Sequence, residues 1–266
     1  MHGAGNDFVV IDNRKGGLPA LDWGKLADRH FGIGCDQVVI LQNSDKADVL
    51  MRIFNADGGE VESCGNASRC VAWLIGKETG KPVRIHTLAG VIEASIAKDA
   101  QVTINMGPPR LDWNEIPLSE PKDTLHLGIA SDALKDPVGV NMGNPHMVFF
   151  VSDALAVPLA TLGPALEHHP LFPERANVGV AQVDAKDKIT LHVWERGAGL
   201  TLACGTGACA ALVAAHRRNL TGRKATVQLP GGVLFIEWRE SDNAVLMTGP
   251  AAVSFKGEFD PDGFAG

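Results

Sequence analysis

Two segments of the sequence place a cysteine where an extended stretch gives way to an apolar helical pattern. They are Glu62-Ser63-Cys64-Gly65-Asn66-Ala67 and Leu202-Ala203-Cys204-Gly205-Thr206-Gly207. The likeness extends upstream, because Asn55 precedes Cys64 by nine positions and Glu195 precedes Cys204 by the same nine. This repetition predicts a duplicated half-site, with one thiol on each wall of a pseudo-symmetric cleft.

Two opposed thiols suit the inversion of a carbon stereocentre by proton transfer, which needs a base on one face of the carbon and an acid on the other. The positive end of a helix dipole can lower the pKa of a cysteine thiol from ~8.5 to about 3.5–7.5. We therefore expect one thiolate and one thiol to coexist near neutral pH. The N–H groups at the same helix ends would bind a carboxylate and stabilise charge that spreads onto it.

The other three cysteines carry weaker signals. Cys70 and Cys209 lie inside apolar helical runs, where core packing is the simpler interpretation, and Cys35 fits either a core or a site. The spacings between the cysteines of each helix do not match paired zinc ligands, so no metal is expected. The glycines near the N-terminus lack the strand-then-helix context of a dinucleotide loop, and no phosphate loop is present, so no cofactor is expected.

The amino-acid composition indicates which kinds of molecule the protein binds. The formal net charge is −7 and no run of Lys or Arg occurs, which argues against nucleic-acid binding and favours a small-molecule substrate. No apolar run approaches the ~20 residues needed to span a bilayer, and the first residues lack the pattern of a secretory signal. Five widely spaced cysteines, an odd number, do not form a disulfide framework, so we expect a cytoplasmic protein with available thiols.

The sequence is rich in turns, with 30 glycines and 15 prolines among 266 residues, and these separate short β-rich runs. Strands are expected over residues 8–11, 37–41, 49–54, 83–86, 148–151, 178–181, 189–194, 226–229 and 233–236. Residues 205–215 are apolar almost all round, which predicts a helix enclosed by protein, and 66–77 are similar. A further, exposed helix is expected over 158–168. The fold class is therefore α/β (α+β), with sheet wrapped around one buried helix in each half.

The joint between the halves is expected at Gly107-Pro108-Pro109-Arg110, where two prolines end a strand pattern, with a second crossing near Gly249-Pro250. The N-terminal half would comprise residues 1–110, completed by 251–266, and would carry Cys64. The C-terminal half would comprise 111–250 and would carry Cys204.

Several polar residues near predicted turns could contribute to a site. His146 could tune a thiol or exchange protons with it, although a histidine at the start of a strand is more often structural. Arg196 is suited to bidentate carboxylate binding, and its neighbour Glu195 leads directly into the Cys204 strand. Turn-associated asparagines could together line a polar pocket; they are Asn6, Asn55, Asn66, Asn144 and Asn177.

From nearly its first residue to its last, the chain resembles the diaminopimelate epimerase family. The segments that carry the resemblance occur in the family's order; they are Met1-His2-Gly3-Ala4-Gly5-Asn6-Asp7-Phe8, Gly32-Ile33-Gly34-Cys35-Asp36-Gln37, Phe54-Asn55-Ala56-Asp57-Gly58, Glu62-Ser63-Cys64-Gly65-Asn66, Gly143-Asn144-Pro145-His146, and Trp194-Glu195-Arg196-Gly197-Ala198-Gly199 through Ala203-Cys204-Gly205-Thr206-Gly207. Ala67 departs from the family, in which a glycine is common at this position.

The resemblance implies two similar domains, each a mostly antiparallel curled sheet around a central helix, with the active site in the cleft between them. It implies interconversion of LL- and meso-diaminopimelate without pyridoxal phosphate or metal, in lysine and peptidoglycan precursor biosynthesis, by a homodimer. Cys64 and Cys204 match the paired acid and base, and His146 and Glu195 match residues that assist proton exchange. The remaining matches are to substrate-binding positions, namely Asn6, Gln37, Asn55, Gly65, Asn66, Asn144, Asn177, Arg196, Gly205 and Thr206.

Three other functions remain open on the sequence alone. A proline or hydroxyproline racemase of the same architecture typically has His where this chain has Asn66. A non-catalytic or redox protein could retain the fold and both thiols. A cysteine hydrolase built on Cys64 and His146 is the weakest alternative, because it leaves the Cys204 copy unexplained.

Overall fold

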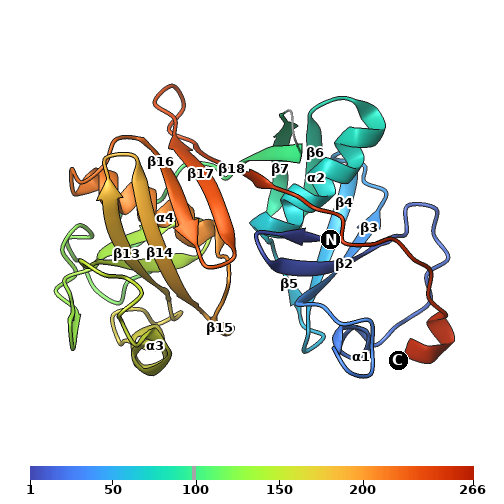
Figure 1. Cartoon of the computed structure of the whole chain (residues 1–266), viewed down its shortest axis with the longest axis horizontal. Coiled ribbons are helices and arrows are strands. Elements are labelled where there is room, and N and C mark those ends of the chain that lie inside the picture. Colours follow the sequence, from blue (N-terminus) through green and yellow to red (C-terminus); the bar gives the residue numbers. More distant parts are fainter. Residues whose placement is uncertain (98–99) are drawn as a thin grey trace. The chain divides into compact units, whose positions relative to one another are not determined.

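The computed structural model of the chain describes residues 1–97 and 100–266 (Figure 1). The chain divides into two compact units, one of residues 1–104 and 249–266 and the other of residues 105–248. The chain changes unit at Asn105 and Gly249, a few residues from the joints expected at 107–110 and 249–250. That these units are the two halves of an epimerase stays a prediction.

The first unit is built on one sheet. Its strands are β1 (His2–Gly3), β2 (Asn6–Asp12), β3 (Gln37–Gln42), β4 (Val49–Asn55), β5 (Glu60–Val61), β6 (Val83–Thr87), β7 (Gly90–Ile96) and β8 (Gln101–Asn105). The strand order is β1-β2-β3-β4-β6-β7-β8, with β5 paired to β4. Helices α1 (Trp23–Ala27) and α2 (Gly65–Thr79) and the short helix η2 (Pro261–Phe264) complete the unit.

The second unit repeats this design. Its strands are β9 (Ala130–Ser131), β10 (Leu134–Lys135), β11 (Val138–Asn141), β12 (Pro145–Phe150), β13 (Asn177–Ala185), β14 (Lys188–Glu195), β15 (Gly199–Leu200), β16 (Lys224–Leu229), β17 (Gly232–Trp238) and β18 (Val245–Pro250). Apart from the separate β9–β10 pair, the order is β11-β12-β13-β14-β16-β17-β18, with β15 on β14. Its helices are α3 (Leu159–Glu167) and α4 (Gly205–Arg217).

The strands of the two units follow the same succession of pairings. In each, an antiparallel pair is followed by a parallel one (β2–β3 and β12–β13), and a second parallel pair follows the central strand (β4–β6 and β14–β16). Within each unit, the other pairs whose register the structure describes are antiparallel. The predicted α/β class and mostly antiparallel sheets are confirmed, and the duplication seen around the cysteines extends to the topology.

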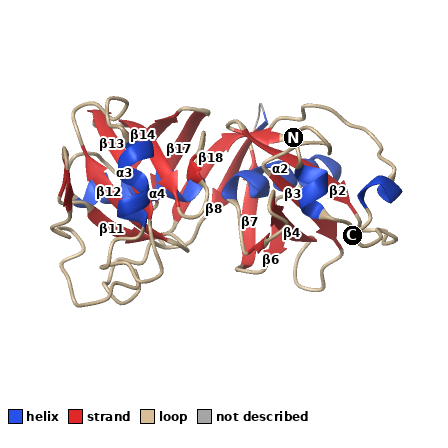
Figure 2. Cartoon of the chain, turned by 90° about the horizontal axis from the view of Figure 1, so that it is seen from below, coloured by secondary structure: helices blue, strands red, loops and turns tan. Residues whose placement is uncertain are grey.

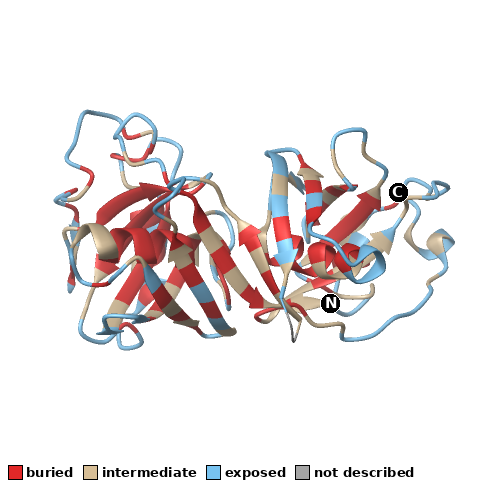
Figure 3. Ribbon diagram, turned by 90° about the horizontal axis from the view of Figure 1, so that it is seen from above, coloured by how far each residue is buried: buried red, intermediate tan, exposed pale blue. Residues whose placement is uncertain are grey.

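Each sheet is placed around a helix that the sequence predicts to be enclosed. In α4 every residue from Gly207 to Ala215 is buried, and the helix contacts strands β11 to β14, β16 and β17 (Figure 2). Helix α2 contacts β1, β6 and β7 and ends at Gly80, whose φ of 69° is the left-handed conformation that glycine adopts readily. Along β6, β14, β16 and β17, buried residues alternate with more exposed ones, as expected for strands that pack against a core on one face only (Figure 3).

Local sequence patterns predicted many of the observed strands and helices and failed to predict others. The nine expected strands all correspond to observed ones, but β12 begins at Pro145, three residues early, and carries His146. The two-residue strands β1, β5, β9, β10 and β15 were not predicted, nor were the longer strands β7, β8, β11 and β18. Strand β7 is mostly exposed and lacks a clear apolar alternation.

The prediction of a helix over residues 158–168 is confirmed by α3, and one face of that helix is exposed as expected, but the other face is buried. Leu159, Gly163, Leu166 and Glu167 of α3 are buried. A Cβ added at Gly163 would lie 2.4 Å from the Trp194 ring, so the helix packs directly on this side chain of β14.

Membrane-spanning helices and metal-binding clusters are both missing from the part of the chain that the structure describes. None of the helices within residues 1–97 and 100–266 is long and apolar enough to cross a membrane. Over the same residues, no group of three or more His, Cys, Asp or Glu side chains is arranged to hold a metal ion.

Candidate active site

Cys64 is the N-cap residue of α2, with extended backbone angles (φ −146°, ψ 115°) that end the preceding stretch and start the helix. Its thiol donates to Asn6 Oδ1 at 3.7 Å. The same oxygen accepts from Asn66 Nδ2 at 3.2 Å, so an amide of β2 contacts both the cysteine and the first turn of α2. The structure thus brings together Asn6, Cys64 and Asn66, which the sequence predicts to share a site.

A second polar pair lies on the neighbouring strands. Gln37 begins β3 and Asn55 ends β4, and the two residues are partners in the strand register. Gln37 Nε2 donates to Asn55 Oδ1 at 2.8 Å, while Gln37 Oε1 is buried and accepts no hydrogen bond within the described residues. This arrangement leaves a buried acceptor for a donor group on a ligand.

Cys204 is the N-cap residue of α4 and differs from Cys64 in its contacts. Its sulfur accepts from the Gly207 N–H at 3.3 Å and lies 3.6 Å from Thr206 Oγ1. Burial, followed by the negative charge of Glu195, raises the pKa of the Cys204 thiol well above its usual value, although the contacts with Thr206 and Gly207 lower it. The expectation that the helix N-terminus lowers a thiol pKa is therefore wrong for Cys204, because desolvation outweighs the helix end.

Glu195 ends β14 and interacts electrostatically with the Cys204 thiol. Burial raises the pKa of the Glu195 carboxyl, and the interactions with Thr201 and Cys204 lower it by a smaller amount. The Thr201 hydroxyl donates to Glu195 Oε1. A carboxylate of raised basicity thus interacts with a thiol that resists ionisation, an arrangement that allows the carboxylate to take the proton of the thiol.

His146 lies on β12, with no exposed surface. Its Nε2 is 2.9 Å from Asn144 Oδ1, an acceptor, so Nε2 carries the proton and Nδ1 does not. Burial, with a smaller contribution from the charge of Arg196, lowers the pKa of His146 to about 3. The imidazole is therefore neutral near pH 7.

Asn177 fixes the turn that carries Arg196. Its Nδ2 donates to the Pro145 carbonyl at 2.9 Å, and its Oδ1 accepts from the Arg196 N–H at 2.9 Å. The Arg196 side chain donates to the Glu174 carbonyl through Nη1. The predicted residues Asn144, His146, Asn177 and Arg196 are thus linked within the second unit.

A buried carboxylate that sequence reasoning missed supports the same turn. Glu167, at the end of α3, is 4% exposed and accepts from Trp194 Nε1 at 2.7 Å and from the Gly197 N–H at 3.0 Å. Arg175 Nη1 lies 3.1 Å from Glu167 Oε1. The hydrogen bonds hold the residues on both sides of Glu195 and Arg196, and no local pattern in the sequence marks Glu167 for this role.

The strand registers show which residues of the two units correspond to each other. Phe8 is opposite Gln37 and Gln37 is opposite Asn55 in the first unit, whereas His146 is opposite Asn177 in the second. Asn177 precedes Val178, which pairs with Trp194, and Trp194 precedes Glu195. Asn6 therefore corresponds to Asn144, Gln37 to Asn177, Asn55 to Glu195 and Cys64 to Cys204. The titratable pair His146 and Glu195 has neutral, non-titrating counterparts in the first unit, Phe8 and Asn55.

The two remaining predictions about cysteines concern the core. Cys70 and Cys209 are fully buried, as expected for packing residues, and burial raises the pKa of Cys70 to about 12. Cys35, which the sequence left open, is 3% exposed, and burial raises the pKa of its thiol as well. Both Cys35 and Cys70 are therefore protonated at neutral pH.

Comparisons with known proteins identify a family. The family model described as Diaminopimelate epimerase matches residues 1–111 and 138–254. The Diaminopimelate epimerase of Erythrobacter litoralis is 56% identical over 263 residues, covering 98% of this chain and 96% of that protein, and that of Acidiphilium cryptum is 53% identical over 264 residues, covering 98% and 95%. A probable proline racemase from Agrobacterium radiobacter, crystallised with bound carbonate, has a TM-score of 0.65 at 19% identity, covering 99% of this chain and 94% of that chain, which shows a shared fold.

Proposed function

The chain belongs to the diaminopimelate epimerase family, and we propose that it interconverts LL- and meso-diaminopimelate by two-base proton transfer at Cα. Its enzyme class is isomerase. The observation that carries the mechanism is the cysteine at the N-cap of each duplicated helix, α2 and α4. The proline-type racemase and non-catalytic alternatives lose support, because relatives at 51–56% identity are diaminopimelate epimerases whereas the probable proline racemase is 19% identical.

In the proposed mechanism Glu195 first takes the proton of the Cys204 thiol. The Cys204 thiolate then removes the Cα proton, forming an S–H bond while the C–H electron pair passes to the substrate and spreads onto its α-carboxylate. The Cys64 thiol delivers its proton to the opposite face of Cα and becomes the thiolate. In the reverse direction the two cysteines exchange roles, so their titrations belong to a coupled pair.

The different surroundings of the two thiols support the proposal that Cys64 starts as the proton donor and Cys204 as the base. Cys64 donates to an amide oxygen, an environment that favours the protonated thiol. Cys204 contacts a carboxyl group that can accept its proton. In this assignment Cys64 of the first unit donates a proton to the substrate. Cys204 of the second unit accepts a proton after Glu195 has deprotonated it.

The Cα proton of an amino acid is only weakly acidic, so the site must stabilise the charge that develops on the α-carboxylate. In our proposal the first turns of α2 and α4 do this, through the backbone N–H groups of Gly65, Asn66, Gly205 and Thr206. Arg196 would bind the distal carboxylate. The amide groups that would complete substrate binding are those of Asn6, Gln37, Asn55, Asn144 and Asn177.

Proton exchange in deuterium oxide tests the function directly. The reduced protein is incubated with LL-diaminopimelate, and Cα deuterium and meso product are followed together, with L-proline in parallel. We expect exchange and inversion on diaminopimelate alone. Turnover of proline instead, or no exchange with either substrate, would contradict the proposal.

Two further parts of the proposal rest on the resemblance and the available thiols. We propose that the protein is a homodimer and that it acts in the cytoplasm, where a reducing environment keeps both cysteines as thiols. Light scattering of the reduced protein measures the first, and a monomer mass would contradict it. Fractionation of cells that express the native gene measures the second.

A further inference from the structure

Four side chains form an unbroken hydrogen-bonded row beside Cys64. Asn6 Nδ2 donates to Asp36 Oδ2 at 2.9 Å, and Asn66 Nδ2 donates to Asn6 Oδ1 at 3.2 Å. Arg69 Nη2 donates to Asn66 Oδ1 at 2.8 Å. The row therefore begins at a carboxylate and ends at a guanidinium, with two amide side chains between them.

The charged ends determine which way both amides point. An ionised carboxylate can only accept hydrogen bonds, so Asn6 must turn its NH₂ group toward Asp36 and its oxygen away. A guanidinium can only donate, so Asn66 must turn its oxygen toward Arg69 and its NH₂ group toward Asn6. The two requirements agree, and flipping either amide would place like groups against each other.

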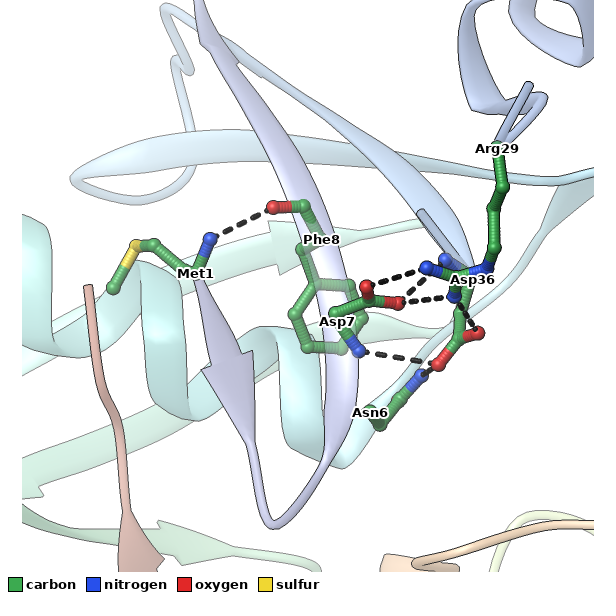
Figure 4. A network of polar contacts seen from close by, with 6 residues as sticks. All are labelled: Met1, Asn6, Asp7, Phe8, Arg29 and Asp36. Atoms are coloured by element: carbon green, nitrogen blue, oxygen red, sulfur yellow. Dashed lines mark hydrogen bonds and ion pairs between the residues drawn. The ribbon is translucent and has the colours of Figure 1, made fainter. Parts of the chain in front are cut away.

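Each end of the row is itself held in place. Arg69 is fully buried on α2, and its Nε donates to the Pro250 carbonyl at 3.3 Å. Asp36 accepts from the Asp7 N–H at 3.1 Å and from Arg29 Nη2 at 2.7 Å, and Arg29 also binds both carboxylate oxygens of Asp7 (Figure 4). The Asp36 N–H in turn donates to Asp7 Oδ1 at 2.9 Å, so the loop and the strand brace each other.

The fixed orientation has one consequence for the candidate acid. The Asn6 oxygen that faces away from Asp36 is the atom to which the Cys64 thiol donates, at 3.7 Å. A carbonyl oxygen stabilises an S–H group and repels a thiolate, whereas an NH₂ group would do the reverse. In the orientation that the row imposes, the Asn6 amide therefore favours the thiol form of Cys64.

We propose that Asp36 is a positioning residue, which fixes the Asn6 amide with its oxygen toward Cys64 and so holds this thiol in its proton-donating form before substrate binds. This rests on the proposed function, in which Cys64 is one of the two acid–base groups. Arg69 is the matching anchor at the other end of the row. Asp36 touches neither thiol nor substrate in this assignment and acts only through Asn6.

The test is the rate at which iodoacetamide alkylates Cys64 in the substrate-free protein, measured by peptide mapping at one neutral pH. The Asp36→Ala variant removes the carboxylate that holds the Asn6 NH₂ group and leaves only the Asn66 amide to oppose a flip. The NH₂ group can then face the sulfur more often and favour the reactive thiolate. We expect Cys64 to be alkylated roughly fivefold faster, as one hydrogen bond of ordinary strength implies. Cys204, whose sulfur contacts Thr206 and Gly207 of the second unit, is the internal reference and should keep its rate.

A second variant keeps the experiment informative if Asp36→Ala does not fold. Asp36→Asn keeps the shape of the side chain, but its amide can meet Asn6 with either end, so the orientation is then held from the Asn66 side alone. We expect the same direction of change with a smaller size. Asp12→Ala is the matched control, because it removes a comparable arginine-bound carboxylate at the other end of β2, where Arg14 contacts Asp12 at 2.6 Å.

The alkylation rates of the two cysteines decide the matter. A faster reaction at Cys64 alone, in an Asp36 variant and not in Asp12→Ala, supports the proposal. An unchanged alkylation rate at Cys64 overturns the proposal. Equal acceleration at Cys64 and Cys204 also overturns it, because that result indicates a general loosening of the folded protein. Alkylation needs no turnover, so failure of the positioning role and failure of the proposed function give separate, distinguishable results in the two experiments.

Discussion

At the scale of single residues, the two thiols occupy matching positions but meet different partners. Cys64 donates to a neutral amide oxygen, whereas Cys204 contacts the carboxyl group of Glu195. Since Asn55 takes the place of Glu195 in the first unit, a carboxyl group occupies this position in the second unit and an amide in the first. The duplicated site is symmetric in its backbone and asymmetric in its proton chemistry.

The Glu195→Gln variant tests that asymmetry. The glutamine side chain has the same shape and can still accept from Thr201, but it cannot take a proton from Cys204. We expect kcat for meso-diaminopimelate formation to fall roughly 100-fold, the lower range for loss of a general base, with a smaller change in KM. Steady-state kinetics measures both constants.

Glu237→Gln is the matched control for this substitution. Glu237 lies on β17, paired with Lys224 at 2.9 Å, and its change should leave kcat within twofold. If Glu195→Gln retains its kcat, Glu195 does not serve as the base for Cys204.

At the scale of elements, the first turn of each helix sets the position of its cysteine. Gly207 of α4 corresponds to Ala67 of α2, three residues after the cysteine in both segments. A Cβ added at Gly207 would lie 3.1 Å from both Cys204 Sγ and Val193 Cγ2, so the sulfur occupies space that a methyl group would need. At Ala67 the methyl group is present and fully buried.

Gly207→Ala should therefore impair the chemistry more than the fold. The added methyl group displaces the Cys204 sulfur by a fraction of an ångström, and we expect kcat to fall roughly tenfold, because acid–base groups tolerate little misplacement. The helix propensity gained by replacing glycine, about 1 kcal/mol, offsets much of the crowding. Thermal unfolding should then occur within a few degrees of the parent protein.

The comparison for this variant is Gly222→Ala, where the added Cβ meets nothing within 4 Å. It should change neither kcat nor the unfolding temperature appreciably. An unaltered kcat in Gly207→Ala would mean that the thiol has more freedom than its contacts indicate.

At the scale of the whole molecule, burial of an uncharged histidine links stability to pH. The pKa of His146 is about 3 in the folded protein and near 6.5 in an unfolded chain. Between these values the unfolded chain binds the proton and the folded protein does not, so acidification favours unfolding. The full stability is present above pH 6.5 and declines as the pH falls toward 3.

We expect His146 to account for about 2 kcal/mol of lost unfolding free energy between pH 7 and pH 5. The raised pKa of Glu195 acts in the opposite sense, because the folded state takes up that proton more readily as the pH falls. Urea unfolding at both pH values, in the parent and in His146→Phe, isolates the histidine, since Glu195 is common to both. Phe occupies the corresponding place, Phe8, in the first unit.

The variant should lose about 2 kcal/mol less than the parent on going from pH 7 to pH 5. An identical pH dependence in the two proteins would show that His146 can be protonated in the folded state.

Local sequence patterns were sufficient to predict the helices and strands that form for local reasons. The enclosed helices follow from apolar residues on all sides, and the N-cap position of each cysteine follows from the change of pattern after Cys64 and Cys204. The repeated spacing of nine residues was enough to identify Asn55 and Glu195 as equivalents, because strand, hairpin and helix follow in the same order in both copies. The family motifs then indicated the chemistry.

Tertiary structure alone decided the environment of these residues. The pKa of Cys204 is raised although its helix end would lower it, since desolvation depends on every element packed around the sulfur. Asp36 and Arg69 lie 33 positions apart, and only the pairing of β2 with β3 and the packing of β1 against α2 bring them to the two ends of one hydrogen-bonded row. Residue types and spacing specify which groups are available, whereas charge state and orientation arise from contacts between segments that are distant in the chain.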